Sequence, residues 1–366
     1  MVPSDDERVL AATVRDVLGD LAPPDKCRLA LEGDRGFDDS VWRALAGDVG
    51  LSGLTIPEEH GGLGLGWAAA AAVHVELGRA LYSGPFLATA LAASALVAAD
   101  DDAVAARWLP AIAAGELTAT VAVADVTGAW DSAGVQASRI ADGWLLSGTR
   151  HFVIAGHIAD LILVVARTSA GDSLFAVDAA LPGIARTPMT GLDLTRRLAL
   201  LEFRDCPAAL VGPEGFADVV IARLGSQLRM ASAAEAAGGL GWCLDTCVEY
   251  ASNREQFGRV IGSYQAVAHP LVDMLGARRT AEACSRWSAV AADLGAPDAM
   301  LAGHVAALRA GEAYIAQTES GVHLLGGIGF TWEHDMHLHY RRARAQAALA
   351  GGAAQHRRAI AGLSGL

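Results

Sequence analysis

Arg254-Glu255-Gln256-Phe257-Gly258 is the stretch that decides the fold of this 366-residue chain. On either side of it lie two long Ala-rich segments, residues 225–252 and 264–294, in which apolar residues recur at helical spacing. A third segment of this kind covers residues 297–325. The pattern predicts long amphipathic helices around the stretch, within a helical region that we place at residues 214–366.

The rest of the chain divides into a helical part and a part with strand-like periodicity. Residues 1–115 carry helical patterns, among them buried Ala-rich helices predicted at residues 68–80 and 87–98. Between them and the last region, residues 116–213 hold short β-type runs punctuated by Gly and Asp. The runs are residues 121–123, 143–148, 161–165, 173–177 and 200–203. Helices, then strands, then helices predict an α+β fold with segregated layers.

Charge and composition exclude several classes of partner. The formal net charge is −13, so general binding to nucleic acid or to an anionic membrane is not expected. The longest uncharged apolar stretch, residues 85–99, is shorter than the roughly 20 residues that span a bilayer. Acidic residues such as Asp5 and Glu7 interrupt the N-terminus, which argues against a signal peptide. We expect a cytoplasmic protein.

The cysteines do not form a recognisable framework. There are five of them, an odd number, and they are scattered along the chain. Cys243 and Cys247 are four residues apart, which is not a zinc-knuckle spacing. We therefore expect buried, inert thiols at Cys27, Cys206, Cys243, Cys247 and Cys284.

Four segments, taken together, resemble the acyl-CoA dehydrogenase family. They follow one another in the family's order and cover most of the chain. They are residues 56–64 (Ile-Pro-Glu-Glu-His-Gly-Gly-Leu-Gly), residues 142–160, residues 229–274 with the Arg254 stretch, and residues 326–330 followed by Tyr340-Arg341. The resemblance implies an N-terminal helical domain (1–115), a central β-domain (116–213) and a C-terminal four-helix bundle (214–366).

The resemblance also implies a chemistry. The family binds FAD and oxidises acyl-CoA thioesters to enoyl-CoA, passing electrons to an electron-transfer flavoprotein-type acceptor. A carboxylate removes the α-proton while the β-hydrogen leaves as hydride to the flavin. In this family each FAD lies across a dimer interface, so one subunit holds the flavin ring and its neighbour contacts the pyrophosphate and adenosine.

The residues that serve a neighbour's FAD are largely present. Arg254 matches the pyrophosphate arginine, whose planar guanidinium suits phosphate oxygens. The other matching positions are Gln256, Phe257, Gln265, Gly326 and Gly327. His323 departs from the family, which usually has Gln there. The alternative for a helical arginine is a solvated face, but the adjoining Gln-Phe-Gly favours the cofactor role.

The residues that would hold the chain's own flavin are altered. The family's loop hydroxyls align with the run from Ala124 to Asp131, where Thr has become Ala124 and Ser has become Trp130. The strand residue that offers a hydroxyl to the flavin is Ile154. None of these three side chains has a hydroxyl group.

The catalytic base is missing at both family positions. The usual glutamate aligns with Ala350 and the alternative position with Leu228. Arg229 matches a substrate-binding position, although Ser226 replaces the Asp common three residues before it. Glu235 is a weak candidate for a relocated base, and an interface or capping carboxylate is the better interpretation.

Three functional hypotheses follow. The first is a partner subunit that completes the FAD site of a second acyl-CoA dehydrogenase-like subunit, as in the α2β2 enzymes of bacterial steroid side-chain oxidation. The second is a self-sufficient homo-oligomer with a relocated base. The third is a non-catalytic acyl-CoA-binding scaffold. A metal site at His334, His337 and His339 is not expected, because no second ligand group stands at metal spacing.

Overall fold

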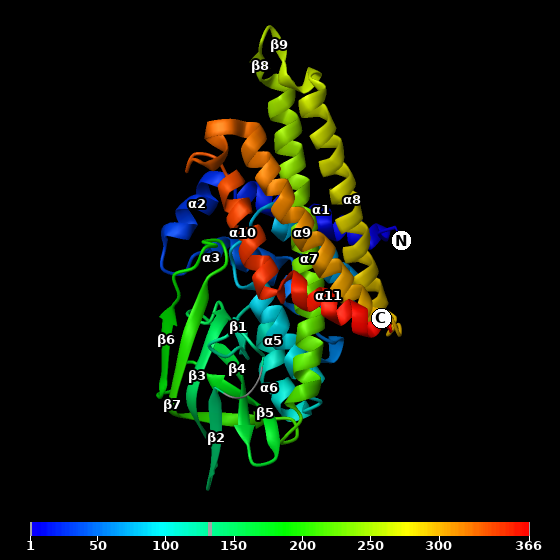
Figure 1. Ribbon diagram of the computed structural model, residues 1–366. Coiled ribbons are helices and arrows are strands. Elements are labelled where there is room, and N and C mark those ends of the chain that lie inside the picture. Colours follow the sequence, from blue (N-terminus) through cyan, green and yellow to red (C-terminus); the bar gives the residue numbers. More distant parts are fainter. Residues whose placement is uncertain (1, 131–133, 366) are drawn as a thin grey trace.

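The computed structural model describes residues 2–130 and 134–365. Helices precede and follow a central sheet (Figure 1). The first helix begins with a capping box: the Ser4 hydroxyl accepts from the Glu7 amide at 3.1 Å, and Glu7 accepts in return from the Ser4 amide. The N-terminal helices are α1 (Asp5–Leu21), α2 (Pro24–Glu32), α3 (Asp39–Arg43), α4 (Trp67–Arg79), α5 (Phe86–Ala98) and α6 (Asp102–Ala113), with short turns η1 (Ala44–Asp48), η2 (Leu51–Gly53) and η3 (Glu58–His60).

The central sheet curls until it closes on itself. Its order is β1-β4-β2-β3-β7-β5, β6 pairs with β7, and β5 also pairs with β4. The side chains enclosed by it include Val135, Leu146, Val164, Phe175 and Phe203. The strands are β1 (Ala119–Ala122), β2 (Val135–Ile140), β3 (Gly143–Ile154), β4 (Leu161–Thr168), β5 (Gly171–Asp178), β6 (Ile184–Pro188) and β7 (Leu198–Val211).

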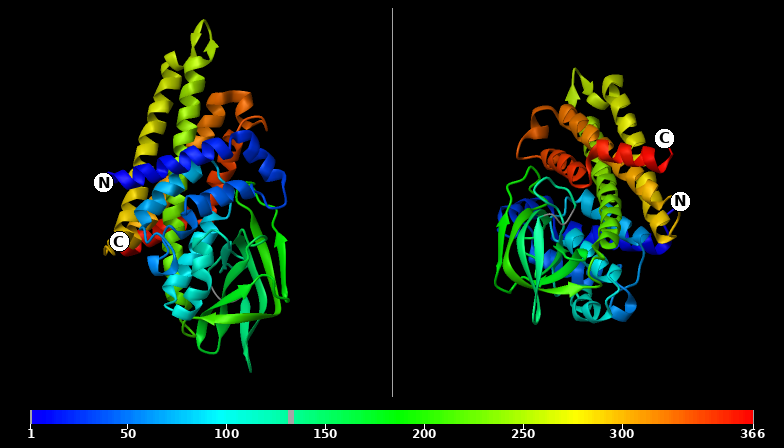
Figure 2. Two further views of the ribbon diagram at one scale, coloured as in Figure 1. Left: turned by 180° about the vertical axis from the view of Figure 1, so that it is seen from behind. Right: turned by 60° about the horizontal axis from the view of Figure 1, so that its bottom comes forward.

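The C-terminal region is built on the long helix α7, which packs against α4, α8 and α9 (Figures 1 and 2). Two glycines allow α4 and α7 to touch. A Cβ on Gly238 would lie 1.9 Å from the Val75 carbonyl oxygen, and one on Gly78 would lie 2.1 Å from that of Glu235. The elements are α7 (Ala217–Asn253), β8 (Glu255–Gln256), β9 (Arg259–Val260), η4 (Ile261–Ser263), α8 (Gln265–Asp293), α9 (Ala299–Leu325), η5 (Gly326–Phe330), α10 (Met336–Leu349) and α11 (Gly352–Leu363).

The α+β fold class is confirmed, and several details differ from expectation. Helix α7 starts at Ala217 rather than at residue 225. Strands β2 and β6 were missed, because residues at their exposed ends are polar and break the apolar pattern. The domain limits 1–115, 116–213 and 214–366 stay proposed boundaries.

Two smaller observations concern the thiols and the membrane. Cys206, Cys243 and Cys247 are buried, but Cys27 and Cys284 are partly exposed, so the expectation of uniformly buried thiols was wrong. Cys27, on α2, lines a cavity between helices and is therefore not enclosed in a packed core. No described helix combines the length and the apolar character needed to cross a bilayer.

Candidate functional site

A cavity of about 350 Å³ lies between the sheet and the helices. Strands β1 and β3 form one wall, and α5, α7 and the last turn of α10 form the other (Figure 1). Its walls are mainly alkyl and aromatic. The lining residues that matter here are Ala88, Leu91, Thr120, Val123, Ala124, Thr127, Trp130, His151, Phe152, Ile154, Leu198, Leu224, Ala345, Ala348 and Leu349.

The three altered flavin positions meet on the sheet wall of this cavity. Ala124, Trp130 and Ile154 all line it, and Ala124 forms a β-bridge with Trp130. The nearby Thr120 hydroxyl is already used, because it donates to the Ile154 carbonyl oxygen at 2.6 Å. Thr127 donates likewise to Asp125, at 2.7 Å. Asp131, the end of the aligned loop, lies outside the described residues.

The helical wall has no proton acceptor at either family position. Ala350 caps the C-terminus of α10, directly after Leu349 on the cavity wall. Leu228, on α7, is buried in the hydrophobic core. No described residue that lines the cavity has a carboxyl group. His151 is an imidazole that the sequence reasoning did not single out, but it projects from the sheet wall and not from the helical wall opposite.

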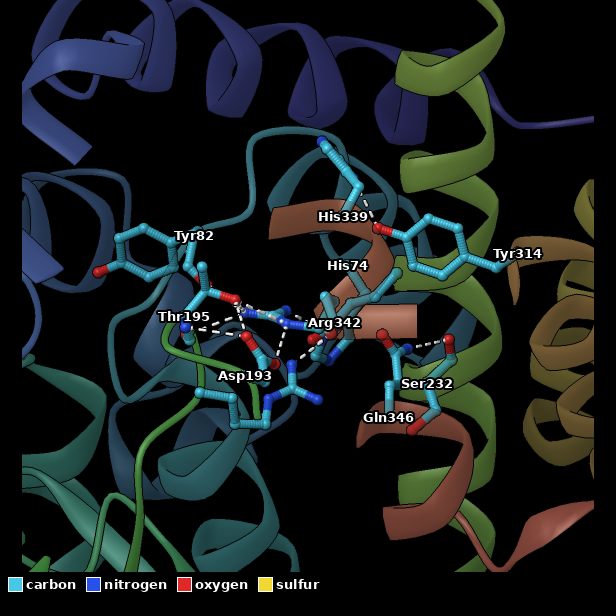
Figure 3. A network of polar contacts seen from close by, with 11 residues as sticks. His74, Tyr82, Asp193, Thr195, Ser232, Tyr314, His339, Arg342 and Gln346 are labelled. Atoms are coloured by element: carbon cyan, nitrogen blue, oxygen red, sulfur yellow. Dashed lines mark hydrogen bonds and ion pairs between the residues drawn. The ribbon is translucent and has the colours of Figure 1, made fainter. Parts of the chain in front are cut away.

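Glu235 lies outside this cavity, within a buried cluster of charges. It is 4% exposed, forms an ion pair with Arg196, and lies 3.4 Å from Arg342 Nη1. His74 Nδ1 lies 3.2 Å from its other carboxyl oxygen. Arg342 also donates to Asp193, at 2.7 Å, and Figure 3 shows that contact.

The ion pairs in this cluster exclude Glu235 as a candidate catalytic base. Burial alone raises the pKa of the Glu235 carboxyl, but Arg196, His74 and Arg342 outweigh burial and hold its pKa well below the usual value. A carboxylate held this way does not accept a proton near neutral pH. Glu235 is not a capping carboxylate, because its partners come from α4, α10 and the loop before β7, three segments that meet at this point of α7.

Arg229 turns away from the cavity as well. Its guanidinium donates to Ser226 Oγ at 3.0 Å, and a Cβ on Gly303 of α9 would lie 3.6 Å from its Nε. Burial lowers its pKa to about 10, so it stays charged at neutral pH. Arg229 does not line the 350 Å³ cavity, which leaves the predicted substrate contact without support from this geometry.

The Arg254 stretch forms an exposed hairpin at the tip of α7 and α8 (Figures 1 and 2). Strands β8 and β9 are joined by Phe257 and Gly258, with φ of +53° and +82°. A left-handed phenylalanine costs on the order of 1 kcal/mol, and Phe257 is nevertheless 92% exposed. Tyr264 supports the hairpin by donating to the Gln256 carbonyl oxygen at 3.3 Å.

The other predicted cofactor residues are exposed too. The described residues offer no acidic partner to the Arg254 guanidinium. Gln265 is exposed at the start of α8, and Gly326 and Gly327 are exposed where α9 ends. Beside these glycines, η5 and the following turn expose large apolar side chains, namely Ile328, Phe330 and Trp332. This half of the molecule therefore presents an arginine, an amide and apolar groups to a partner.

The two halves of the predicted flavin site are far apart within one chain. Leu224 lines the cavity near the start of α7, and Arg254 follows its end. Thirty helical residues at 1.5 Å each separate them by about 45 Å. That exceeds the reach of a single dinucleotide, so one chain does not surround one FAD with both sets.

Two of the three histidines near α10 have different hydrogen-bond partners. His334 Nδ1 accepts from the Met336 amide at 3.0 Å, whereas His339 Nδ1 lies 2.6 Å from the Tyr314 hydroxyl. Over the described ranges, no three potential metal-ligating side chains gather.

Known proteins share this sequence and this fold. Models of the acyl-CoA dehydrogenase N-terminal and C-terminal domains match residues 4–116 and 215–363. The chain is 36% identical to acyl-CoA dehydrogenase IpdE2 of Mycobacterium tuberculosis, over 95% of this chain and 94% of that protein. It is similar to a chain of the ChsE4-ChsE5 complex from the same species (30% identity, TM-score 0.89, 100% and 98% coverage). It is also similar to a chain of the Tcur3481-Tcur3483 steroid ACAD (30% identity, TM-score 0.88, 99% and 98% coverage). The chain therefore belongs to the acyl-CoA dehydrogenase family, FAD-dependent oxidoreductases that act on the CH–CH bond of acyl-CoA thioesters.

Proposed function

We propose that this chain is the partner subunit of a heteromeric acyl-CoA dehydrogenase. In this role it completes the FAD site of a second, catalytic subunit and does not itself remove the α-proton. The observation that carries the proposal is the contrast within one chain. Ala350 and Leu228 stand at the two family positions for the carboxylate, and Ile154 lines the cavity where a hydroxyl is needed, while Arg254 stands exposed without an acidic partner among the described residues.

The exposed end has the groups that a neighbour's FAD requires. Arg254 supplies a fixed positive charge and paired N–H donors for the pyrophosphate. Gln256 adds a polar contact, Phe257 an apolar wall, and Gly326 and Gly327 let the backbone approach the adenosine closely. Gln265 completes this set. When bound, FAD supplies the hydride acceptor; these residues bind and orient it.

The cavity end fits a flavin poorly. The two positions that would offer hydroxyl donors hold Ala124 and Ile154, and Trp130 occupies the place of a small serine. We therefore derive no catalytic step within this chain's own cavity. Two similar structures carry two subunit names each, ChsE4-ChsE5 and Tcur3481-Tcur3483, which supports a hetero-oligomer here.

The finer assignments belong to the same proposal. We assign an acyl-CoA substrate to the complex, an electron-transfer flavoprotein-type acceptor, and a cytoplasmic location. The name of one similar protein includes the word steroid, which supports a steroid-type acyl-CoA as the first substrate to test.

The test is co-expression with a second acyl-CoA dehydrogenase-like chain from the same genome. We expect co-purification, about one FAD for every two chains, and turnover only when both chains are present. This chain purified alone should be colourless and inactive. A yellow, active protein from this chain alone contradicts the proposal and favours the homo-oligomer, and a colourless complex contradicts it in favour of a scaffold.

A further inference from the structure

A second cavity, of about 260 Å³, lies on another side of the molecule. Helices α1, α2 and the end of α4 form one side of it, and α7 and α10 form the other. It shares no lining residue with the 350 Å³ cavity. A single water needs only about 10–15 Å³, so this space can hold an organic molecule.

His339 supplies the most deeply buried polar group on the wall of this cavity. Its side chain is 1% exposed and stacks on Trp242 with ring centroids 4.1 Å apart and planes 18° apart. Its Nδ1 lies 2.6 Å from the Tyr314 hydroxyl, a contact shown in Figure 3. The described residues offer no hydrogen-bond partner to Nε2, the second nitrogen of the ring.

The Tyr314 contact fixes which ring nitrogen carries the proton. Burial raises the pKa of the Tyr314 hydroxyl well above its usual value, so it stays protonated. No other acceptor for that proton exists among the described residues, and a buried hydroxyl without one is costly. Tyr314 therefore donates to His339 Nδ1, and the neutral imidazole carries its own hydrogen on Nε2. His339, which lines the cavity, thus carries one neutral, oriented N–H donor.

The charges around the cavity neutralise one another. Arg15 pairs with Glu76 at 2.6 Å, and Arg28 pairs with Asp335 at 2.5 Å. The third arginine on the wall, Arg79, pairs with Asp245 at 2.7 Å. Between these pairs the walls are apolar, formed by Leu18, Ala22, Pro23, Leu31, Leu81 and Leu338. An unpaired charge on a ligand would find no free counter-charge here, so the surroundings favour a neutral molecule.

We propose that this cavity binds a small, neutral, mainly apolar molecule whose carbonyl oxygen accepts a hydrogen bond from His339 Nε2. The apolar body of the ligand lies against the leucine side chains, and the oxygen reaches the imidazole. This site is separate from the flavin site and stands whether or not the chain completes a partner's active site.

A matched pair of probes tests the proposal: 5-bromo-1-indanone has the carbonyl oxygen, and 5-bromoindane lacks it. Calorimetry on the full-length chain, with any subunit that accompanies it, should show the ketone binding about threefold to tenfold tighter, the value of one net hydrogen bond. Anomalous diffraction from bromine should place the ketone beside His339. Equal affinities, no saturable binding, or bromine only in the 350 Å³ cavity overturns the proposal.

Two variants distinguish the contribution of the His339 hydrogen bond from that of the cavity volume. Tyr314→Phe/His339→Phe removes both hydrogen-bonding partners together while a ring remains against Trp242, so folding should survive. In this double variant, the ratio of the affinities for the ketone and for 5-bromoindane should fall to about one. Gly19→Leu adds bulk to the cavity wall, where an added Cβ meets nothing within 4 Å, and should weaken both probes equally. A ketone preference that persists in the double variant contradicts the role of His339.

Discussion

The hairpin end and the cavity end of this molecule differ in the chemical groups that they present. At the hairpin, polar and aromatic groups are exposed: Arg254 has no acidic partner among the described residues, and Phe257 is 92% exposed in a left-handed conformation. At the cavity end, Ile154 lines the wall and Ala350 follows the last lining residue of α10, and neither side chain donates or accepts hydrogen bonds.

Under the proposed function, the hairpin is the half of the shared site that still has to bind FAD. A phenylalanine with positive φ costs free energy, and the two-residue turn between β8 and β9 imposes that conformation on Phe257. Alkyl side chains in the cavity fill space and cost nothing. The proposal that this chain donates residues to another subunit's FAD site can be tested at each end.

The largest expected effect lies in the charge cluster beside the cavity. Glu235→Gln removes the carboxylate that faces Arg196 and Arg342 and leaves two buried positive charges undercompensated. We expect the free energy of unfolding to fall by about 3–5 kcal/mol in a urea titration. Asp245→Asn is the control, because its pair with Arg79 is exposed and contributes at most about 1 kcal/mol. A stable variant that loses turnover would instead identify Glu235 as a base.

The lowered pKa of Glu235 predicts that the free energy of unfolding depends on pH. The folded-state pKa of Glu235 lies well below its unfolded value of about 4.5, so at acidic pH the unfolded chain binds the extra proton. The stability that Glu235 contributes is present above that value and is lost as pH falls toward the folded pKa. Glu235→Gln should therefore flatten the decline of stability in acid.

At the hairpin, Arg254→Ala should weaken FAD binding in the complex. A hydrogen bond to a charged group contributes about 1.5–3 kcal/mol, which corresponds to roughly 10- to 150-fold in the dissociation constant. The measurement is flavin released on dilution, followed by fluorescence. Arg358→Ala, at an exposed position on α11, is the matched control and should retain FAD. Full FAD retention by Arg254→Ala contradicts the role in the partner's site.

A smaller effect separates function from stability at Phe257. Phe257→Gly removes the strain of a positive φ and, by itself, should leave stability unchanged or raise it by up to about 1 kcal/mol. The complex should nevertheless hold FAD less tightly, because the apolar wall is gone. Thermal unfolding and flavin release, measured on one preparation, give both values. A loss of stability without a change in FAD binding would make Phe257 a structural residue only.

For the last variant we expect no change in turnover. Ala350→Glu returns a carboxylate to the family position at the end of α10, yet we expect no turnover by the chain alone. The flavin wall still holds Ala124, Trp130 and Ile154, which offer no hydroxyl. Dye-reduction assays with an acyl-CoA provide the measurement. Activity in Ala350→Glu would mean that the cavity end lost its base alone.

Part of the site could be read from residue identity and spacing. The hairpin residues, the alanine at the base position and the altered flavin positions are local sequence facts, and the structure places Ala124, Trp130 and Ile154 on one wall. Strands with exposed polar ends, such as β2, were not recognised, because their alternation is weak. His151 and His339 were not recognised as lining residues of cavities, since nothing local distinguishes a cavity-facing histidine.

The sequence by itself determined the family, the fold class and the residue types present at each end. Only the tertiary structure decided that Glu235 is an ion-pair partner, that Arg229 turns toward α9, and that the two predicted halves of the flavin site lie about 45 Å apart. The reason is physical. Helical periodicity fixes which residues share a face, but the partners of a buried charge come from segments far apart in the chain, and only packing brings them together.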